Sequence, residues 1–229
     1  MLTVCCMQPA IRLTVDPKTR EEAAYETLRR AIVEGRWGQG EPLVGSRLAD
    51  EMGVSRITVA NALKRLSGEG FVLLTPHKEA MVARLDPEQV REIYLMRAEL
   101  ETLAIREATR RMTPRDLAEL HAMNDEIGRR HEAGAGIAEL RALDWAFHHR
   151  LRTVSGMPLL SQTLKNLADQ CEGYRARLLD ERPLIVPSSQ RHAAILAALT
   201  VGDAAAAGDA MREHVLGGMR AVIANIDEP

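Results

Sequence analysis

Apolar side chains recur every three to four residues along most of the chain, a spacing that predicts amphipathic helices. A first helix is expected over about residues 20–34, with Ala24, Leu28, Ala31 and Ile32 on its inward face. Two shorter helices are predicted in SRLADEM, which Gly53 ends, and in SRITVANALKRL, which Ser55 caps. GRWGQGEPL reads as a glycine-rich loop. FVLLT and AMVARL are rich in β-forming residues, and PHKE between them indicates a hairpin.

The pattern changes after Arg84. Asp86-Pro87 and Thr113-Pro114 each supply an N-cap and a first-turn proline, so they open two helices that end near Met112 and Gly134. Four more are expected: one at 137–154, one that follows the separating SGMP and carries Leu160 to Leu178, and two at about 189–200 and 203–225. Short connectors between amphipathic helices indicate an antiparallel bundle.

We therefore predict a mainly α chain in three parts. Residues 1–19 are expected to be a flexible tail. Residues 20–85 form a winged helix-turn-helix, with three helices and a β-hairpin wing. Residues 86–229 form an all-helical bundle of about six helices, which carries the binding site and the dimer contacts.

Composition and charge exclude several classes of protein. Hydrophobic residues make up 46% and charged residues 27%, as in a soluble protein with a sizeable core. The formal net charge of −2 excludes a generally basic nucleic-acid coat but allows a local basic surface. Three cysteines suggest no disulfide framework, and no apolar run approaches the roughly 18 residues of a membrane span. Without a recognisable signal peptide, we expect a cytoplasmic protein with no membrane partner.

The second short helix has distinct inner and outer faces. Its apolar inward residues are Val59, Ala62, Leu63 and Leu66. Its outward residues are Arg56, Thr58, Asn61, Lys64 and Arg65. Between Gly53 and Leu66 there are three basic residues and no acidic one. A recognition helix presents such residues to base edges and phosphates, although an ordinary solvated helix face would look similar.

The bundle segment contains inward-facing polar residues. In DWAFHHRL, Asp144 and His148 flank the apolar stripe, whereas His149 falls on the opposite face. His192 and His214 lie on the apolar sides of two later helices. Three imidazoles and a carboxylate suit Zn, Ni, Mn or Fe(II), with Zn expected first. The alternative for each histidine is a hydrogen-bonded core residue without metal.

Two arginines are also predicted to face inward. Arg97 lies in line with Ile93 and Leu100, and Arg175 lies between Cys171 and Leu178. A buried guanidinium favours an anion, and its fork geometry favours a carboxylate. The alternative for Arg97 is a structural salt bridge with Glu101. Asn124, inward on the second bundle helix, is expected to add a hydrogen bond to the ligand.

The N-terminal segment from YETLRR to MVARL resembles the DNA-binding domain of the GntR family of bacterial transcription regulators. The shared framework is I..G....G..L.....LA...GVSR..V..AL..L...G. The resemblance implies that Arg56 reads a base, that Ser55 and Thr58 hold phosphate or base edges, and that the wing tip enters the minor groove. The wing-tip residues are His77 and Lys78.

This chain departs from the GntR pattern at several positions. Thr58-Val59-Ala60-Asn61 stands where the family often has Pro-Val-Arg-Glu, so a frequent base-reading arginine is missing. Ser46, with Arg47 beside it, replaces an arginine that often contacts the DNA backbone, and Glu79 replaces a wing glycine. Because of these changes, we do not expect this chain to recognise the operator sequence that is usual for the family.

Residues of about 86–225 resemble the helical ligand-sensing (FCD) domain of the FadR-like branch of this family. The similarity rests on DxxFH at Asp144–His148, on RHAAILAALTVGDAAAAGDAMREH and on RAELE at Arg97–Glu101. In the metal-binding members, the ligands match Asp144, His148, His192 and His214. Their effectors are often small organic acids bound beside the metal.

The expected function is a ligand-responsive transcription regulator, most simply a repressor. It would bind palindromic double-stranded operator DNA as a homodimer, because one winged helix contacts few base pairs. A small carboxylate would bind at the metal and change operator affinity. Two alternatives are a purely structural metal and a metal-dependent hydrolase. An enzyme is not expected, because neither HExxH nor a nucleophile elbow is present.

Overall fold

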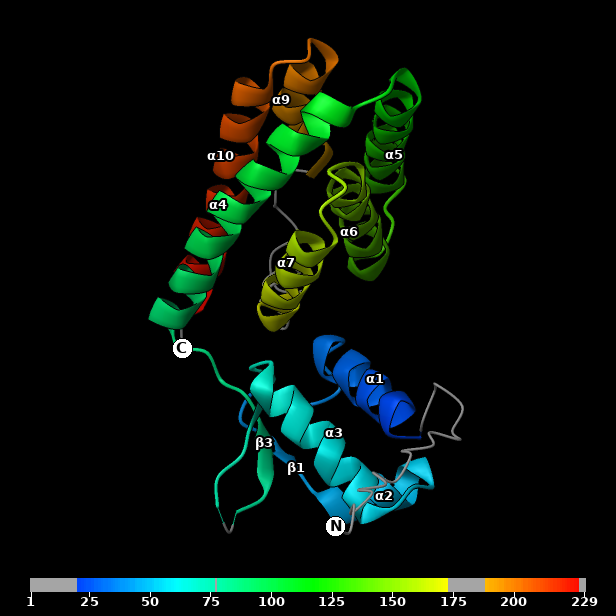
Figure 1. Ribbon diagram of the computed structural model, residues 1–229, viewed down its shortest axis with the longest axis vertical. Helices are drawn as coiled ribbons and strands as arrows, with labels where there is room; N and C mark the ends of the chain where they lie inside the picture. The colour runs from blue at the N-terminus through cyan, green and yellow to red at the C-terminus, as the bar shows by residue number, and fades with distance from the viewer. Residues whose placement is uncertain (1–19, 77, 173–187, 227–229) are drawn as a thin grey trace, which may run out of the picture.

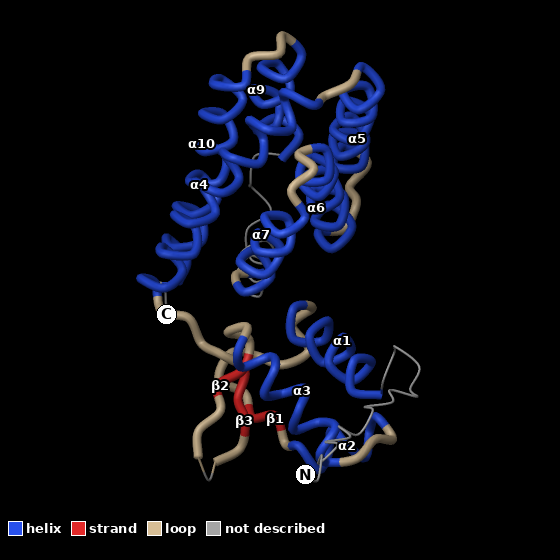
Figure 2. Tube along the Cα trace, in the orientation of Figure 1, coloured by secondary structure: helices blue, strands red, loops and turns tan. Residues whose placement is uncertain are grey.

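The computed structural model describes residues 20–76, 78–172 and 188–226. Two helical units lie one above the other, with the N-terminal unit at the bottom of the view (Figure 1). The described part confirms the predicted mainly α fold, with a small sheet confined to the N-terminal unit (Figure 2). In the described ranges, no helix combines the length and apolarity that a bilayer crossing requires. The predicted tail lies outside these ranges.

The N-terminal unit packs three helices against a three-stranded antiparallel sheet of order β1-β3-β2. Its elements are α1 (Arg20–Val33), β1 (Pro42–Leu43), α2 (Gly45–Met52), α3 (Arg56–Gly68), β2 (Val72–Leu73) and β3 (Ala80–Val82). The predicted hairpin is present as β2 and β3. The glycine-rich loop was predicted without a strand, but β1 lies within it, because Leu43 is buried and pairs with Ala80.

A tight turn between α2 and α3 sets where α3 begins. Gly53 adopts φ +63°, and its backbone N–H closes the end of α2. Ser55 then caps α3 by accepting the backbone N–H of Thr58 at 3.1 Å. The four residues predicted to face inward on α3 are all buried. The apolar face of α3 is therefore packed inward, and its polar face points outward.

The C-terminal unit contains six helices within the described residues. They are α4 (Pro87–Arg111), α5 (Pro114–Glu132), α6 (Ile137–Val154), α7 (Pro158–Gln170), α9 (Ser188–Thr200) and α10 (Ala204–Ile226). Asp86 and Thr113 each form the capping box of the helix that follows. The fourth bundle helix was predicted to extend to about Leu178. In the structure α7 ends at Gln170, with Cys171 as its C-cap. Residues 173–187 lie outside the described ranges.

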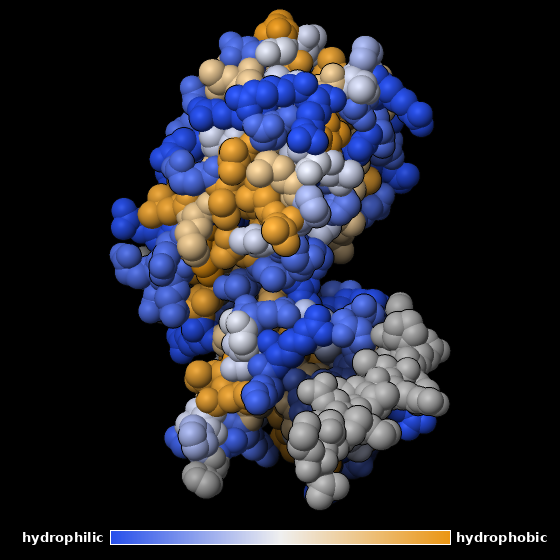
Figure 3. Space-filling view, in the orientation of Figure 1, coloured by the Kyte–Doolittle hydropathy of each residue, from blue (hydrophilic) through white to orange (hydrophobic). Residues whose placement is uncertain are grey.

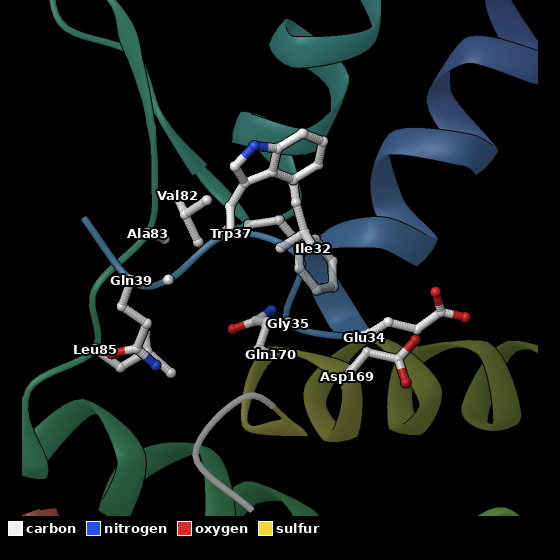
Figure 4. Close-up of a pocket in the computed structure, with 13 residues that line it drawn as sticks. Ile32, Glu34, Gly35, Trp37, Gln39, Val82, Ala83, Leu85, Asp169 and Gln170 are labelled. Atoms are coloured by element: carbon white, nitrogen blue, oxygen red, sulfur yellow. The ribbon is translucent and has the colours of Figure 1, made fainter. Parts of the chain in front are cut away.

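A buried ion pair joins the two units. Arg29 of α1 donates to Asp169 of α7 at 2.6 Å, and its second Nη donates to Asn166 at 2.8 Å. Gln170 donates to the backbone oxygen of Glu69 at 3.0 Å. A cavity of about 180 Å³ lies beside these contacts, lined by residues of both units, among them Trp37 (Figure 4).

Breaking this ion pair should destabilise the protein. Asp169→Asn would leave the buried Arg29 with only the more distant Glu69, at 3.5 Å, as a carboxylate partner. We expect the free energy of unfolding to fall by about 1–3 kcal/mol, as for the loss of a buried charged hydrogen bond. Urea denaturation followed by circular dichroism measures it. The control is Glu213→Gln, which removes an exposed pair with Arg220. Equal midpoints for the two variants would contradict this role of Asp169.

Candidate functional site

Three histidines from three helices meet inside the bundle. His148 lies on α6, His192 on α9 and His214 on α10, and one ring nitrogen of each lies within 4.8 Å of the others. Phe147, next to His148, is fully buried and stacks on the His192 ring with centroids 4.1 Å apart. The apolar stripe of α6 therefore carries the site inward.

Asp144 lies one helical turn before His148 and faces the same cluster. Its Oδ1 is 3.4 Å from Nε2 of His192. Nε2 of His148 is 3.1 Å from Nε2 of His214. All four residues that the sequence indicated as metal ligands are thus gathered in one place, whereas His149 is exposed on the far face of α6.

Two of the separations between these atoms match those around a single divalent cation. Ligand atoms about 2.0–2.2 Å from a common ion lie roughly 3.0–3.5 Å apart when they are neighbours around it. The 3.1 Å and 3.4 Å separations fall within that interval. The donor set, three imidazoles and one carboxylate, also suits zinc and its first-row neighbours. The residues present therefore fit a metal ion.

Asn124 of α5 holds the ring of His192. Its Oδ1 lies 3.0 Å from Nδ1 of His192, and its Nδ2 donates to the backbone oxygen of Ser189 at 3.2 Å. An amide oxygen can only accept, so Nδ1 of His192 carries the proton and Nε2 is left with a lone pair. The sequence predicted that Asn124 contacts a ligand. The structure instead places it behind His192, in the orienting position typical of metal sites.

The environment of His148 also favours a neutral ring. Desolvation by burial lowers the pKa of His148 well below its usual value, and the nearby His214 and His192 act in the same direction. Asp144 opposes this shift. At neutral pH the imidazole of His148 is therefore uncharged, which is the form that binds metal ions.

A small cavity of about 50 Å³ adjoins the cluster. Its lining includes Asp144, His148 and His214 together with Arg97 and Gly218. One water molecule needs about 10–15 Å³ of cavity volume, so this cavity has room for only a few waters. A ligand there must be small and can touch the histidines.

Arg97 is a charged residue of the cavity whose guanidinium keeps unused donors among the described residues. It is buried over the ring of Tyr94, 4.9 Å from the centroid. Its Nε and Nη1 are buried and make no hydrogen bond to any described residue. The alternative salt bridge with Glu101 does not form in the described structure, because Glu101 is bonded to Arg152 (Nε to Oε1, 3.1 Å).

Three other charged residues, which the sequence did not assign to the ligand site, also line this cavity. They are Glu101, Arg152 and Arg191. Glu101 and Arg152 form a buried ion pair between α4 and α6. No local signal connects two residues 51 positions apart, although the inward position of each could be estimated from helical periodicity. Arg175, expected to bind the ligand, lies outside the described residues.

The outward face of α3 offers a second candidate site. Ser55, Arg56 and Lys64 are exposed there, while the Thr58 hydroxyl lies 2.8 Å from that of Ser55. Lys78 is exposed on the loop between β2 and β3, and its neighbour His77 lies outside the described residues. Arg47 on α2 is exposed, with its Nε 2.9 Å from Glu51.

Two of the residues predicted to face DNA are held by α1 instead. Asn61 donates to Glu21 at 3.1 Å. Arg65 donates to Glu22 at 2.6 Å and lies over the ring of Tyr25, 3.6 Å from its centroid. The hydrogen bond to Glu22 raises the pKa of Arg65. These partners come from 40 or more residues away, so the helical pattern of α3 alone could not reveal them.

Known proteins match both units of the chain. Residues 20–82 match the family described as bacterial regulatory proteins, gntR family, and residues 92–217 match the FCD domain. An uncharacterized HTH-type transcriptional regulator in an unstable DNA locus of Streptomyces ambofaciens is 29% identical over 210 residues, covering 92% of this chain and 86% of that protein. The HTH-type transcriptional repressor RspR of Escherichia coli (strain K12) is 26% identical over 195 residues, covering 83% of each.

A solved structure shows the same fold along nearly the whole chain. E. coli McbR/YncC superposes with a TM-score of 0.76 at 23% identity, over 91% of this chain and 99% of that one. The match to the FCD domain covers more than half of the chain, and the gntR match covers the DNA-binding unit. The chain therefore belongs to the GntR family of bacterial transcription regulators, with a winged helix-turn-helix followed by an FCD ligand-binding domain.

Proposed function

We propose that this regulator is a repressor that senses a small organic acid at a metal ion in its FCD domain. The observation that supports this most strongly is the meeting of Asp144, His148, His192 and His214 beside a small cavity that also contains the buried Arg97. Side chains that could bind a metal ion, an anion-binding group and space for a ligand thus occur together. The effector would change the affinity of the DNA-binding domain for its operator.

In this proposal the cation is bound by the three histidines and Asp144, with zinc as the first candidate. Bound there, it would supply a Lewis acid that attracts one carboxylate oxygen. The protein's own contribution is to present neutral imidazoles: Asn124 fixes the proton of His192 on Nδ1, and burial keeps His148 uncharged. A chemical role as a hydrolase is not proposed, because the relatives named above are transcription regulators.

Arg97 would bind the carboxylate of the effector. Its Nε and Nη1 are buried without a hydrogen-bond partner among the described residues, so each could donate to an oxygen of an anion. The small volume of the cavity limits the effector to a compact acid of a few carbon atoms. The stacking of Arg97 on Tyr94 would keep the guanidinium in place before the ligand arrives.

Contacts between the described residues connect this site to the DNA-binding domain. Arg141, one turn before Asp144 on α6, donates to Glu172 beyond the end of α7 at 2.8 Å. Asp169 of α7 in turn binds Arg29 of α1 at 2.6 Å. A displacement of α6 on ligand binding would reach α1 through these ion pairs. Such coupling between sites typically amounts to about 1–3 kcal/mol and acts equally in both directions.

The regulator is proposed to act as a homodimer on a palindromic operator. On α4, Leu95, Met96 and Leu103 lie on one face and are exposed although apolar. In the space-filling view, apolar surface gathers over the middle of the bundle, whereas the N-terminal domain is mostly polar (Figure 3). A second copy could cover this surface, and a two-fold axis would then pair the two recognition helices.

The role of Arg56 can be separated from that of Lys64. A duplex enriched from a random pool by the full-length protein would serve as the operator. We expect Arg56→Ala to abolish the preference for that duplex over a scrambled one, since a bidentate contact to guanine contributes about 1–3 kcal/mol per half-site. Lys64→Ala should weaken binding to both duplexes and reduce the log–log salt slope by about one. Fluorescence anisotropy measures both, and an unchanged preference in Arg56→Ala would contradict its role.

Metal binding can be tested with two adjacent histidines on α6. His148→Ala removes a proposed ligand and should lower the zinc affinity by at least the roughly 10- to 100-fold expected even for an orienting residue. His149→Ala, on the exposed face, should leave it unchanged. The zinc affinity of Asn124→Ala should lie between those of the two histidine variants. Isothermal titration calorimetry with Zn²⁺ measures these affinities. Equal zinc binding by the His148 and His149 variants would refute the site. Chelation that unfolds the protein would favour a structural metal.

Arg97→Gln should uncouple the effector from DNA. The probe is a panel of small carboxylates, such as acetate, lactate and malate, added to the zinc-loaded protein on its enriched duplex. The concentration needed to release DNA should rise by about tenfold or more, because a hydrogen bond to a charged group is lost. Arg110→Gln, exposed on the same helix, is the control. If both variants respond like the parent protein, Arg97 does not bind the effector.

A further inference from the structure

Ile57 is unusually exposed for a large apolar residue, because the other large apolar side chains of α3 are buried. It lies in the first turn of α3 with 73% of its surface exposed, whereas Val59, Leu63 and Leu66 are buried. A single exposed isoleucine is common on protein surfaces and needs no explanation by itself. Its position is informative, because the first turn of a recognition helix is the part that reaches base edges.

The neighbours of Ile57 extend this apolar surface. Ala60 and Asn61 follow at three and four positions, so they lie on the same face of α3, and both are exposed. Asn61 is directed to Glu21 of α1 and is not free to meet DNA in this arrangement. Ile57 and Ala60 therefore form the centre of the exposed face at the N-terminal end of α3.

Charge around this apolar centre matches a DNA groove. Arg56 precedes Ile57, and Lys64 lies two helical turns after it on the same face. No acidic residue occurs between Gly53 and Leu66. Apolar side chains flanked by cations would meet a surface that is negative at the phosphates and carries an apolar group between them. In the major groove, that apolar group is the 5-methyl group of thymine.

We propose that Ile57, supported by Ala60, contacts the 5-methyl group of a thymine in the major groove and thereby specifies a T·A pair. This thymine would lie beside the base read by Arg56, since the two residues are adjacent in the first turn of α3. The inference rests on α3 being the DNA-reading helix, as proposed above. It assigns part of the operator specificity to an apolar contact in a chain where Asn61 and Arg65 are held by α1.

The test removes the methyl group from DNA and the side chain from the protein, separately and together. The full-length protein selects its preferred duplex from a random pool. Each thymine of that duplex is then replaced in turn by deoxyuridine, which pairs identically and lacks only the 5-methyl group. At one thymine per half-site, we expect the parent protein to bind about three- to tenfold more weakly, the effect of losing one buried methyl contact.

Ile57→Ala should bind the thymine and deoxyuridine duplexes equally well, because the side chain that senses the methyl group is gone. Its salt dependence should match that of the parent protein, since no charge is removed. Leu73→Ala, an exposed apolar residue on β2, is the matched control and should keep the full deoxyuridine effect. Circular dichroism of each variant verifies the fold.

Three outcomes would overturn the proposal. The parent protein could be insensitive to deoxyuridine at every position, the Ile57→Ala variant could keep the same sensitivity, or the selected duplex could lack a constant thymine. If Arg56→Ala still abolished sequence preference in any of these cases, the DNA-reading role of α3 would stand and only the role of Ile57 would fall.

Discussion

The FCD domain depends on holding three imidazoles and a carboxylate inside an apolar helical bundle. A buried polar group is costly unless it is hydrogen-bonded or coordinated, and His192 has no exposed surface at all. Its ring is held on one edge by Asn124, on its face by Phe147 and on the other edge by Asp144. These contacts come from α5 and α6, so one side chain of α9 is held by two other helices. The same constraint leaves the adjoining cavity next to groups that can bind a cation.

The contact between the two domains has a different character. It rests on Arg29, Asp169 and Gln170, and thus on charged and polar groups rather than on a continuous apolar core. Interfaces of this kind between domains of one chain generally permit relative motion. The apolar cores of the two domains are separate, one centred on α1 and α3 and the other on α4 and α10. A regulator of this build can change the angle between its domains without repacking either core.

Much of the fold could be predicted because its signals are local. The bounds of α6 follow from helical periodicity between Gly136 and Ser155, and α4 begins where Asp86-Pro87 predicts it. The inward direction of Asp144 and His148 follows from the same periodicity. What could not be predicted depends on partners distant in the sequence. The strand β1 forms by pairing with β3. Asn124 forms a hydrogen bond with His192, which lies 68 residues away in the sequence. Likewise, helical spacing placed Arg65 on the outward face of α3, but its side chain donates to Glu22 of α1.

The division of α3 into two faces has a consequence for how such regulators diverge. The side chains that pack α3 into the domain are different from those that face outward. The packed ones are Val59, Ala62, Leu63 and Leu66. Exchanges at Ile57 or Ala60 would leave the packing of α3 intact, because neither contributes to the buried core. A duplicated gene could therefore acquire new target sites by surface replacements alone. New regulons could in this way arise without passing through unstable intermediates.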